Sequence, residues 1–151
     1  MTRSFRSWPC LVLLSGLIPG LATGCSSPTG PAPVPCTQTV AFAGQAQVAT
    51  GNPLVQPFTT SATGALDVTV DWRSETDIMN VVLAQSPCDA ERLAAAGCNV
   101  LFSLWSPPKP LQDSTSLLRA GTYVLIVGNP NTATETVSAH VILRSAGCPV
   151  P

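Results

Sequence analysis

The chain has 151 residues, which is enough for one domain, and only 10% of them are charged. Seven basic and eight acidic residues give a formal net charge of −1. Two of the basic residues, Arg3 and Arg6, precede Cys25, so the segment from Cys25 onward carries five basic and eight acidic residues, a net charge of −3. This balance argues against nucleic acid as a partner, because phosphates are recognised by a basic surface.

Residues 1–24 have the three parts of a secretory signal peptide. Residues 1–7 carry two positive charges and no acid, residues 8–18 are apolar, and small residues follow. The apolar run is too short for a transmembrane helix, which needs about 20 apolar residues. We therefore expect residues 1–24 to be removed on export.

The junction between the leader and the rest of the chain reads Leu21-Ala22-Thr23-Gly24-Cys25. This stretch resembles the lipobox of bacterial lipoproteins, although Ala22 stands where the lipobox usually has Leu. The resemblance implies that Cys25 is acylated, with palmitate or a similar fatty acid, and anchors the protein in a membrane. Ser26 in place of Asp after the cysteine implies the outer membrane. A type I signal peptidase is the alternative, since it would cut at the same bond and release a soluble secreted protein.

The cysteine count supports a special role for Cys25. Cys10 leaves with the leader, so five cysteines remain, and an odd number in an exported protein requires an explanation. Cys25 is the odd one, and the others can form two disulfides in an oxidising compartment. Four cysteines allow three pairings. We favour the nested one, because only it keeps one bridge local: Cys36 with Cys148, and Cys88 with Cys98.

Residues 25–35 form the predicted lipidated cysteine and tether. Residues 26–35 read SSPTGPAPVP, with four prolines in ten residues. Proline fixes φ and removes backbone donors, which favours an extended spacer of about 30 Å. A single domain over residues 36–151 follows it.

Short runs of alternating apolar residues, separated by turn residues, predict that residues 36–151 are all-β. In residues 65–72, for example, Leu66, Val68, Val70 and Trp72 fall on one face. About eight strands in this length predict an antiparallel β-sandwich, such as a jelly roll. The expected strands are residues 39–48, 54–61, 65–72, 77–85, 99–105, 114–118, 122–127 and 136–144.

Residues 86–97 interrupt the strand pattern and predict one short helical insert. Ser86 fits an N-cap, Pro87 the first helical position and Gly97 the helix end. Residues 122–127 are apolar at nearly every position, so we expect this strand to be covered on both faces.

Two segments carry a family resemblance: Asp77-Ile78-Met79-Asn80-Val81-Val82-Leu83, and Leu118-Arg119-Ala120-Gly121-Thr122-Tyr123-Val124-Leu125-Ile126-Val127-Gly128-Asn129. In order and spacing they resemble the bacterial pre-peptidase C-terminal domain, over roughly residues 40–143. The resemblance implies a non-catalytic jelly-roll β-sandwich of the kind appended to secreted peptidases. Asn80 stands where the family commonly has Asp, which argues against carrying over a calcium site.

The polar residues predict no active site. His140 is the sole histidine, and its phase in the last strand places it on the solvent face, so a Ser-His-Asp triad is not expected. Asp67 and Asp71 share a strand face about 13 Å apart, too far for a glycosidase pair. Asp71, Glu75 and Asp77 could hold Ca²⁺, but a solvated turn is the favoured interpretation. The spacing of Cys88 and Cys98 does not indicate a zinc site. We expect no metal and no cofactor.

Three aromatic side chains could form a sugar-binding platform: Trp72, Trp105 and Tyr123. Trp72 shares the apolar phase of its strand and is expected in the core. Trp105 ends its strand before Ser106-Pro107-Pro108 and is the candidate ligand-binding aromatic. The sequence thus predicts a lipid-anchored, non-enzymatic envelope module with a binding or structural role. The alternatives are a carbohydrate-binding module and an accessory subunit of a separately encoded peptidase.

Overall fold

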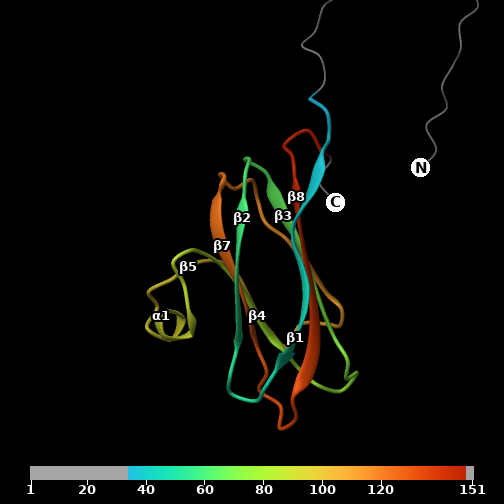
Figure 1. Cartoon of the computed structure of the whole chain (residues 1–151), viewed down its shortest axis with the longest axis vertical. Helices are drawn as coiled ribbons and strands as arrows, with labels where there is room; N and C mark the ends of the chain where they lie inside the picture. The colour runs from blue at the N-terminus through green and yellow to red at the C-terminus, as the bar shows by residue number, and fades with distance from the viewer. Residues whose placement is uncertain (1–33, 149–151) are drawn as a thin grey trace, which may run out of the picture. The chain divides into compact units, whose positions relative to one another are not determined.

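The computed structural model describes residues 34–148 (Figure 1). The predicted leader, Cys25 and the tether up to Pro33 lie outside the described residues. So do residues 149–151.

The described chain contains eight strands and one short helix, in the order expected. They are β1 (Gln38–Val48), β2 (Leu54–Thr60), β3 (Ala65–Trp72), β4 (Asn80–Gln85), α1 (Ala90–Ala94), β5 (Asn99–Trp105), β6 (Leu111–Ser114), β7 (Gly121–Gly128) and β8 (Glu135–Arg144). The predicted all-β class is therefore confirmed.

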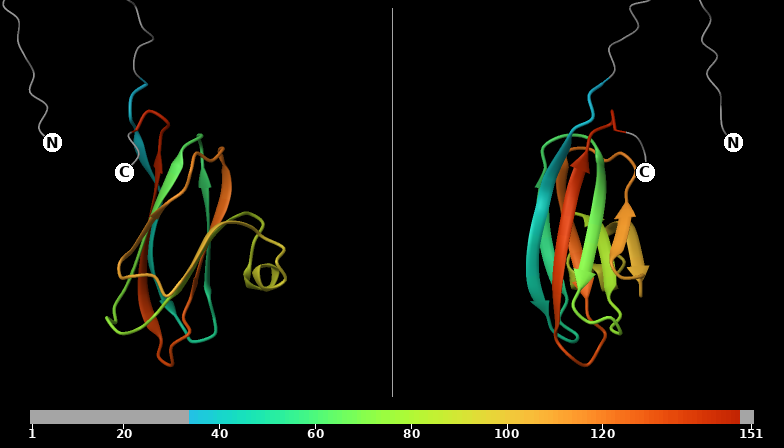
Figure 2. Two further views of the ribbon diagram at one scale, coloured as in Figure 1. Left: turned by 180° about the vertical axis from the view of Figure 1, so that it is seen from behind. Right: turned by 90° about the vertical axis from the view of Figure 1, so that its right-hand side faces the viewer.

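The strands form two antiparallel four-stranded sheets. The first sheet has the order β1-β8-β3-β6 and the second has the order β2-β7-β4-β5. Every connection crosses from one sheet to the other except β4 to β5, which gives the jelly-roll arrangement. Figure 2 shows β1, β8 and β3 side by side in one layer, with the second sheet behind them.

The core lies between the two sheets and follows the two-residue period of the strands. The predicted inward residues of β3 are all buried, and so are the alternating apolar residues of β8, which are Val137, Ala139, Val141 and Leu143. Met79, just before β4, and Val81 and Leu83 of β4 are fully buried, and Leu83 lies beside Leu125 of the neighbouring strand β7. Alternation in sequence thus places one face of each strand in the core.

A second, smaller cluster covers the outer face of the second sheet. It contains Val82 and Ala84 from β4 and Val124 and Ile126 from β7, with Leu93 of α1 packed against them. Figure 1 shows α1 beside this sheet. Because the insert covers it, β7 is apolar on both faces, and the prediction for residues 122–127 is confirmed.

The helix begins later than the sequence predicts. Its N-cap is Asp89, whose Oδ1 accepts a hydrogen bond from the Arg92 backbone N–H at 2.8 Å, and not Ser86. Ser86 instead donates its backbone N–H to the Thr122 carbonyl and so continues the sheet. Ser and Asp are both good N-cap residues, but Ser86 is held in the sheet, so Asp89 caps the helix.

Two strand boundaries also differ. The sixth strand is Leu111–Ser114, whereas residues 114–118 were expected. Leu111 is buried opposite Val70, so burial fixes the strand there, and Leu118 forms an isolated bridge with Gly64. β4 begins at Asn80 and not at Asp77, because the Ser74 hydroxyl accepts hydrogen bonds from the backbone N–H groups of Thr76 and Asp77 and holds a turn there.

Two disulfides join the four described cysteines in the nested pairing. Cys36–Cys148 connects the segment before β1 to the segment after β8, with 4.4 Å between the Cα atoms. Cys88–Cys98 closes the helical insert, with 5.3 Å between the Cα atoms. Among residues 34–148, no helix has the length and apolar character needed to cross a membrane.

Candidate functional site

An apolar groove of about 280 Å³ lies on the outer face of the second sheet. Its floor comes from β4 and β7, and one side comes from the insert. Trp105, at the end of β5, lines it as well. The lining residues are Pro53, Asn80, Val82, Ala90, Leu93, Ala94, Trp105, Ile126 and Gly128.

The strand register places the residues of this groove. Asn80 of β4 pairs with Trp105 on one side and with Gly128 of β7 on the other. Residues that pair directly in antiparallel strands project from the same face, so the three positions form one row across the sheet. Gly128 has no side chain, and this keeps the row open at that point.

The Trp105 side chain is the exposed aromatic of the described chain. Its relative exposure is 72%, whereas most apolar residues of the adjoining strands are buried. β5 ends here because Ser106 has a positive φ of 55° and Pro107-Pro108 follows. The strand thus ends at Trp105, whose side chain lines the groove.

Asn80 supplies the polar side chain of the groove. Within residues 34–148 its side-chain amide forms no hydrogen bond, although Asn80 is half-buried. An amide offers two N–H donors and a carbonyl acceptor. The site thus combines one aromatic face, one available amide and an otherwise aliphatic surface.

The other two candidate aromatics do not join Trp105. Trp72 is buried, and its Nε1 donates to the Asp77 carbonyl at 2.9 Å. Tyr123 is buried beside Phe58, with ring centroids 6.0 Å apart, and its hydroxyl donates to the Arg119 carbonyl. Burial raises the pKa of the Tyr123 hydroxyl above its ordinary value. The three-aromatic platform is therefore wrong, and Trp72 is a core residue as expected.

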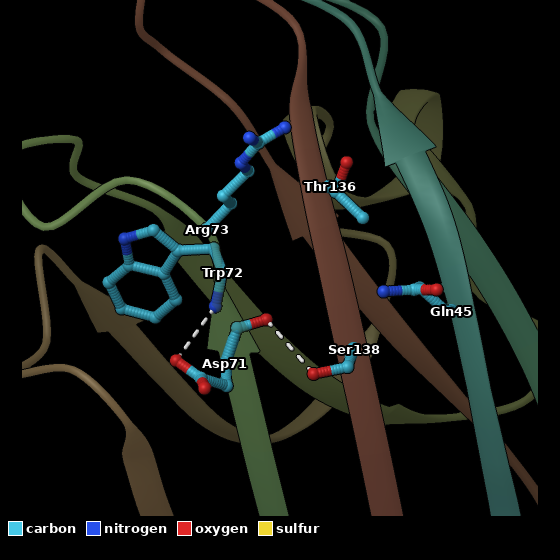
Figure 3. Close-up of a pocket in the computed structure, with 6 residues that line it drawn as sticks. All are labelled: Gln45, Asp71, Trp72, Arg73, Thr136 and Ser138. Atoms are coloured by element: carbon cyan, nitrogen blue, oxygen red, sulfur yellow. Dashed lines mark hydrogen bonds between the residues drawn. The ribbon is translucent and has the colours of Figure 1, made fainter.

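A second depression, of about 370 Å³, lies on the first sheet and is polar. It is lined by Gln45, Asp71, Trp72, Arg73, Thr136 and Ser138 (Figure 3). The Trp72 ring points away from it, and the Ser138 hydroxyl lies 3.5 Å from the Asp71 carbonyl. The groups of this depression are typical of a solvated strand face.

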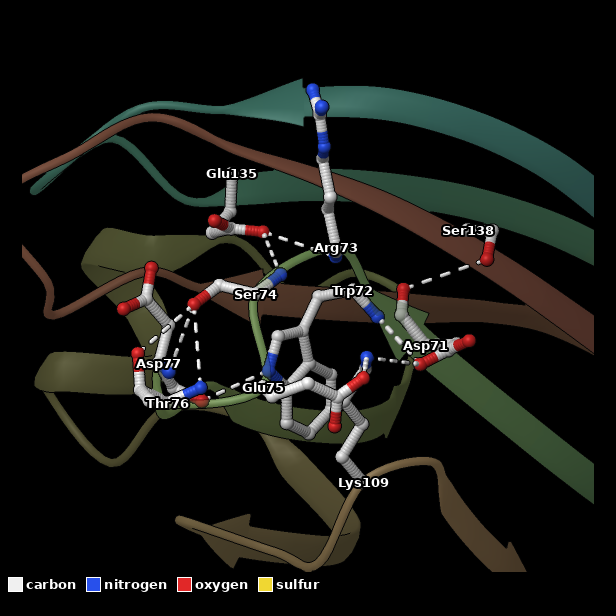
Figure 4. A network of polar contacts seen from close by, with 10 residues as sticks. All are labelled: Asp71, Trp72, Arg73, Ser74, Glu75, Thr76, Asp77, Lys109, Glu135 and Ser138. Carbon is white, nitrogen blue, oxygen red and sulfur yellow. Dashed lines mark hydrogen bonds and ion pairs between the residues drawn. The ribbon is translucent and has the colours of Figure 1, made fainter.

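The acidic turn after β3 carries its own cation. Lys109 Nζ lies 2.5 Å from Glu75 Oε1 and 3.8 Å from Asp71 Oδ1 (Figure 4). The hydrogen bond to Glu75 raises the pKa of Lys109 above its ordinary value. Asp77 contributes its backbone to the turn and no ligand to this pair. Within residues 34–148, no group of three or more His, Cys, Asp or Glu is arranged to hold a metal ion.

Glu135 stabilises the same turn from β8. It is buried, and its Oε2 accepts hydrogen bonds from the backbone N–H groups of Arg73 and Ser74 at 3.1 and 3.2 Å. A buried carboxylate with two backbone donors is satisfied in place, so its role is to hold the turn.

The remaining candidate acids and the histidine lie on the outer face of the first sheet. His140 is half-buried on β8, opposite Ala43 and Thr69, and within residues 34–148 it forms no hydrogen bond with Ser138 or an aspartate. Asp67 forms a two-point ion pair with Arg144, at 2.9 and 3.0 Å, and accepts from the Ser114 hydroxyl. The Arg144 hydrogen bonds lower the pKa of Asp67, with a smaller effect from Ser114.

The fold of this chain is similar to those of known protein structures. The pre-peptidase C-terminal domain of a collagenase from Bacillus anthracis is similar, with a TM-score of 0.51 and 14% sequence identity, over 68% of this chain and 89% of that domain. The Yersinia pseudotuberculosis-derived mitogen gives a TM-score of 0.47 and 12% identity, over 77% of this chain and 98% of the mitogen. No protein-family model matches the chain, and no curated protein matches it.

The described domain is thus a β-sandwich with the fold of a pre-peptidase C-terminal domain, as the sequence resemblance implied. The sequence pattern singles out Trp105 as a candidate but does not reveal the groove beside it. The groove needs Asn80 and Gly128, which are far from Trp105 in sequence, and the wall formed by α1. The family resemblance offered a signal for these residues. Its two segments, residues 77–83 and residues 118–129, contain Asn80 and Gly128 and form the neighbouring strands β4 and β7.

Proposed function

We propose that this protein is a lipid-anchored, non-enzymatic module of the bacterial cell envelope that binds an apolar segment of another protein. The observation that carries the proposal is the groove beside Trp105. It unites an exposed indole, an aliphatic floor and one available amide.

The chemistry of the groove favours a protein segment as the ligand. Its lining is nearly all carbon, from Val82, Leu93 and Ile126 together with alanines, a proline and the Trp105 ring. Apolar side chains gain about 25 cal/mol per Å² on burial there. The hydroxyl groups of a sugar would lose hydrogen bonds to water and find few partners. The Asn80 amide can bond to the backbone of an extended segment.

A carbohydrate ligand is the second candidate, and one specific observation favours it. The exposed face of Trp105 can stack against the apolar face of a sugar ring, and the Asn80 amide lies in the same row of the sheet. The two candidates differ in how many polar partners the ligand requires.

A groove-filling variant tests the site. A Cβ at Gly128 would lie 3.7 Å from Asn80 Cβ, an ordinary contact, so Gly128→Leu fills the groove without a backbone clash. The full chain is titrated with synthetic extended aliphatic peptides and, separately, with soluble oligosaccharides, while tryptophan emission is recorded. Leu117→Ala is the matched control, because Leu117 is 58% exposed and does not line the groove.

We expect the peptides to shift the emission of the wild-type protein and of Leu117→Ala to shorter wavelength, and to leave Gly128→Leu unchanged. An oligosaccharide response that Gly128→Leu abolishes would establish the carbohydrate function instead. A peptide response of equal size in Gly128→Leu would reject the groove as the site.

The anchor is supported by the cysteine count. The two disulfides use Cys36, Cys88, Cys98 and Cys148, and Cys25 has no counterpart among them. Disulfides and exported β-sandwiches both belong to oxidising compartments. We expect Cys25→Ala to move the protein from the membrane fraction to the soluble extracytoplasmic fraction. Retention of Cys25→Ala in the membrane would refute the lipid anchor.

A further inference from the structure

The outer edge of β5 is the least protected strand edge of the second sheet. The other edge strand of this sheet, β2, contains Pro57, which cannot donate to a ladder. In the first sheet, the edge strand β6 has only four residues and carries Asp113, whereas the other edge strand, β1, is uncharged like β5. β5 has the sequence NVLFSLW, with no charge and no proline, and both Val100 and Trp105 are exposed on it. Charges and prolines are the usual protection against edge pairing.

The register shows which backbone groups of β5 point outward. The Ser106 N–H donates to the Met79 carbonyl at 3.1 Å, so Trp105 and Asn80 form a pair without mutual hydrogen bonds. Two residues along, Ser103 and Val82 form the next pair of this kind. The backbone N–H and C=O groups of Ser103 and Trp105 therefore point away from β4, toward the free edge.

We propose that β5 pairs antiparallel with β5 of a second copy of this chain and joins the two second sheets into one. Ser103 of each copy would lie opposite Trp105 of the other, with Leu104 at the two-fold axis. This register uses the outward backbone groups and avoids the bulge between the pairs Leu83–Phe102 and Ala84–Val100. It forms two hydrogen-bonded pairs.

The absence of charge on β5 supports a second copy as the occupant. A two-fold pairing centred on Leu104 brings the residues next to the axis, such as Ser103, close to their own counterparts, and like charges in such positions are destabilising. An uncharged strand meets no repulsion from its own copy. The pairing places Ser103 of the other copy beside Trp105. The proposal rests on the backbone edge of β5 and does not depend on the groove ligand.

A charge-exchange experiment tests the pairing. In the proposed register the two Ser103 side chains are diagonal neighbours about 7–8 Å apart, within reach of long side chains. The full chain is purified in a mild non-ionic detergent, and its mass is measured by sedimentation velocity over a wide range of concentration. The variants are Ser103→Asp, Ser103→Lys and an equal mixture of the two. Gln45→Asp is the matched control, because Gln45 is exposed on β1, the remaining uncharged edge strand.

We expect the wild-type protein and Gln45→Asp to form dimers as concentration rises. Ser103→Asp and Ser103→Lys should each remain monomeric, and their mixture should form dimers again. A wild-type protein that stays monomeric at every concentration overturns the proposal, and so does a Ser103→Asp variant that dimerises like the wild type. Loss of the dimer in Gln45→Asp alone would place the interface on β1 and also overturn it. Gly128→Leu should dimerise normally, which separates this result from ligand binding.

Discussion

Asn80 lies directly opposite Trp105 in the β4–β5 ladder and directly opposite Gly128 in the β4–β7 ladder. A glycine, an amide and an exposed indole therefore form one row across three strands. In this row the glycine leaves space, the amide offers donors and an acceptor that no residue among 34–148 uses, and the indole presents an apolar face. The groove depends on this row, so single substitutions can fill it or open it while the core between the sheets remains intact.

Substitution of the two described tryptophans should destabilise the protein to different extents. Trp72→Phe removes a buried indole and its hydrogen bond to the Asp77 carbonyl, and we expect a loss of about 1–3 kcal/mol in the free energy of unfolding. Trp105→Phe changes an exposed side chain and should cost less than about 0.5 kcal/mol. Urea unfolding of both variants measures the difference. Equal losses would contradict the burial described here.

Removing each disulfide should give unequal losses of stability. The Cys36–Cys148 bridge has a sequence separation of 112 and the Cys88–Cys98 bridge a separation of 10. Chain-entropy estimates give upper values of about 5 and about 3 kcal/mol, respectively. Paired Cys→Ser variants, unfolded by denaturant under oxidising conditions, test the order. A larger loss for the Cys88–Cys98 pair would show that the insert contributes more than its loop length.

Removing the Cys88–Cys98 bridge should also expose the smaller apolar cluster on the outer face of the second sheet. Cys88 packs with Val82 and Ile126, so loss of the Cys88–Cys98 bridge frees the segment that covers them. We expect faster hydrogen exchange in α1 and unchanged exchange in β3. Unchanged exchange in α1 would show that packing of Leu93 alone holds the insert.

The Asp67–Arg144 pair predicts a loss of stability in acid. The Arg144 hydrogen bonds lower the pKa of Asp67 in the folded protein below its ordinary value of 3.8. A lowered folded-state pKa stabilises the protein above the unfolded-state value, and this contribution disappears as the pH falls through the folded-state pKa. We therefore expect Asp67→Asn to cost about 1–3 kcal/mol at neutral pH and to reduce the acid dependence below 3.8.

Denaturant unfolding as a function of pH measures this effect. Asp77→Asn is the control, because the Asp77 carboxylate forms no ion pair or hydrogen bond within residues 34–148. The same acid dependence in Asp67→Asn and the wild type would contradict the prediction.

Gly64 should tolerate no side chain. A Cβ there would lie 2.5 Å from the Arg144 carbonyl oxygen and 2.8 Å from Leu143 Cδ1. The backbone bridge between Gly64 and Leu118, at 3.0 and 2.8 Å, limits how far the segment can move. We expect Gly64→Ala to destabilise the fold by about 1–3 kcal/mol. Gly121→Ala, whose Cβ would meet only ordinary contacts with Tyr123, should leave the melting temperature nearly unchanged.

Much of the fold was predictable because burial on one face leaves a period of two in the sequence. Leu66, Val68, Val70 and Trp72 followed this rule and are buried. The boundaries were less predictable. β6 was misplaced because the pairing of Leu111 with Val70 depends on a strand distant in sequence. The N-cap was misplaced because Ser86 and Asp89 are both good caps, and the pairing of Ser86 with Thr122 decides between them.

By itself, the sequence determined the all-β class and the buried faces of the strands, and it favoured one of three cysteine pairings. The first two features depend on local periodicity and on the residues that interrupt it. Only the tertiary structure decided that Trp72 and Tyr123 are separated from Trp105, that Lys109 lies against the acidic turn, and that Asn80 and Gly128 complete a groove. Each of these depends on which strands become neighbours, and hydrogen-bond pairing between segments distant in sequence sets that arrangement.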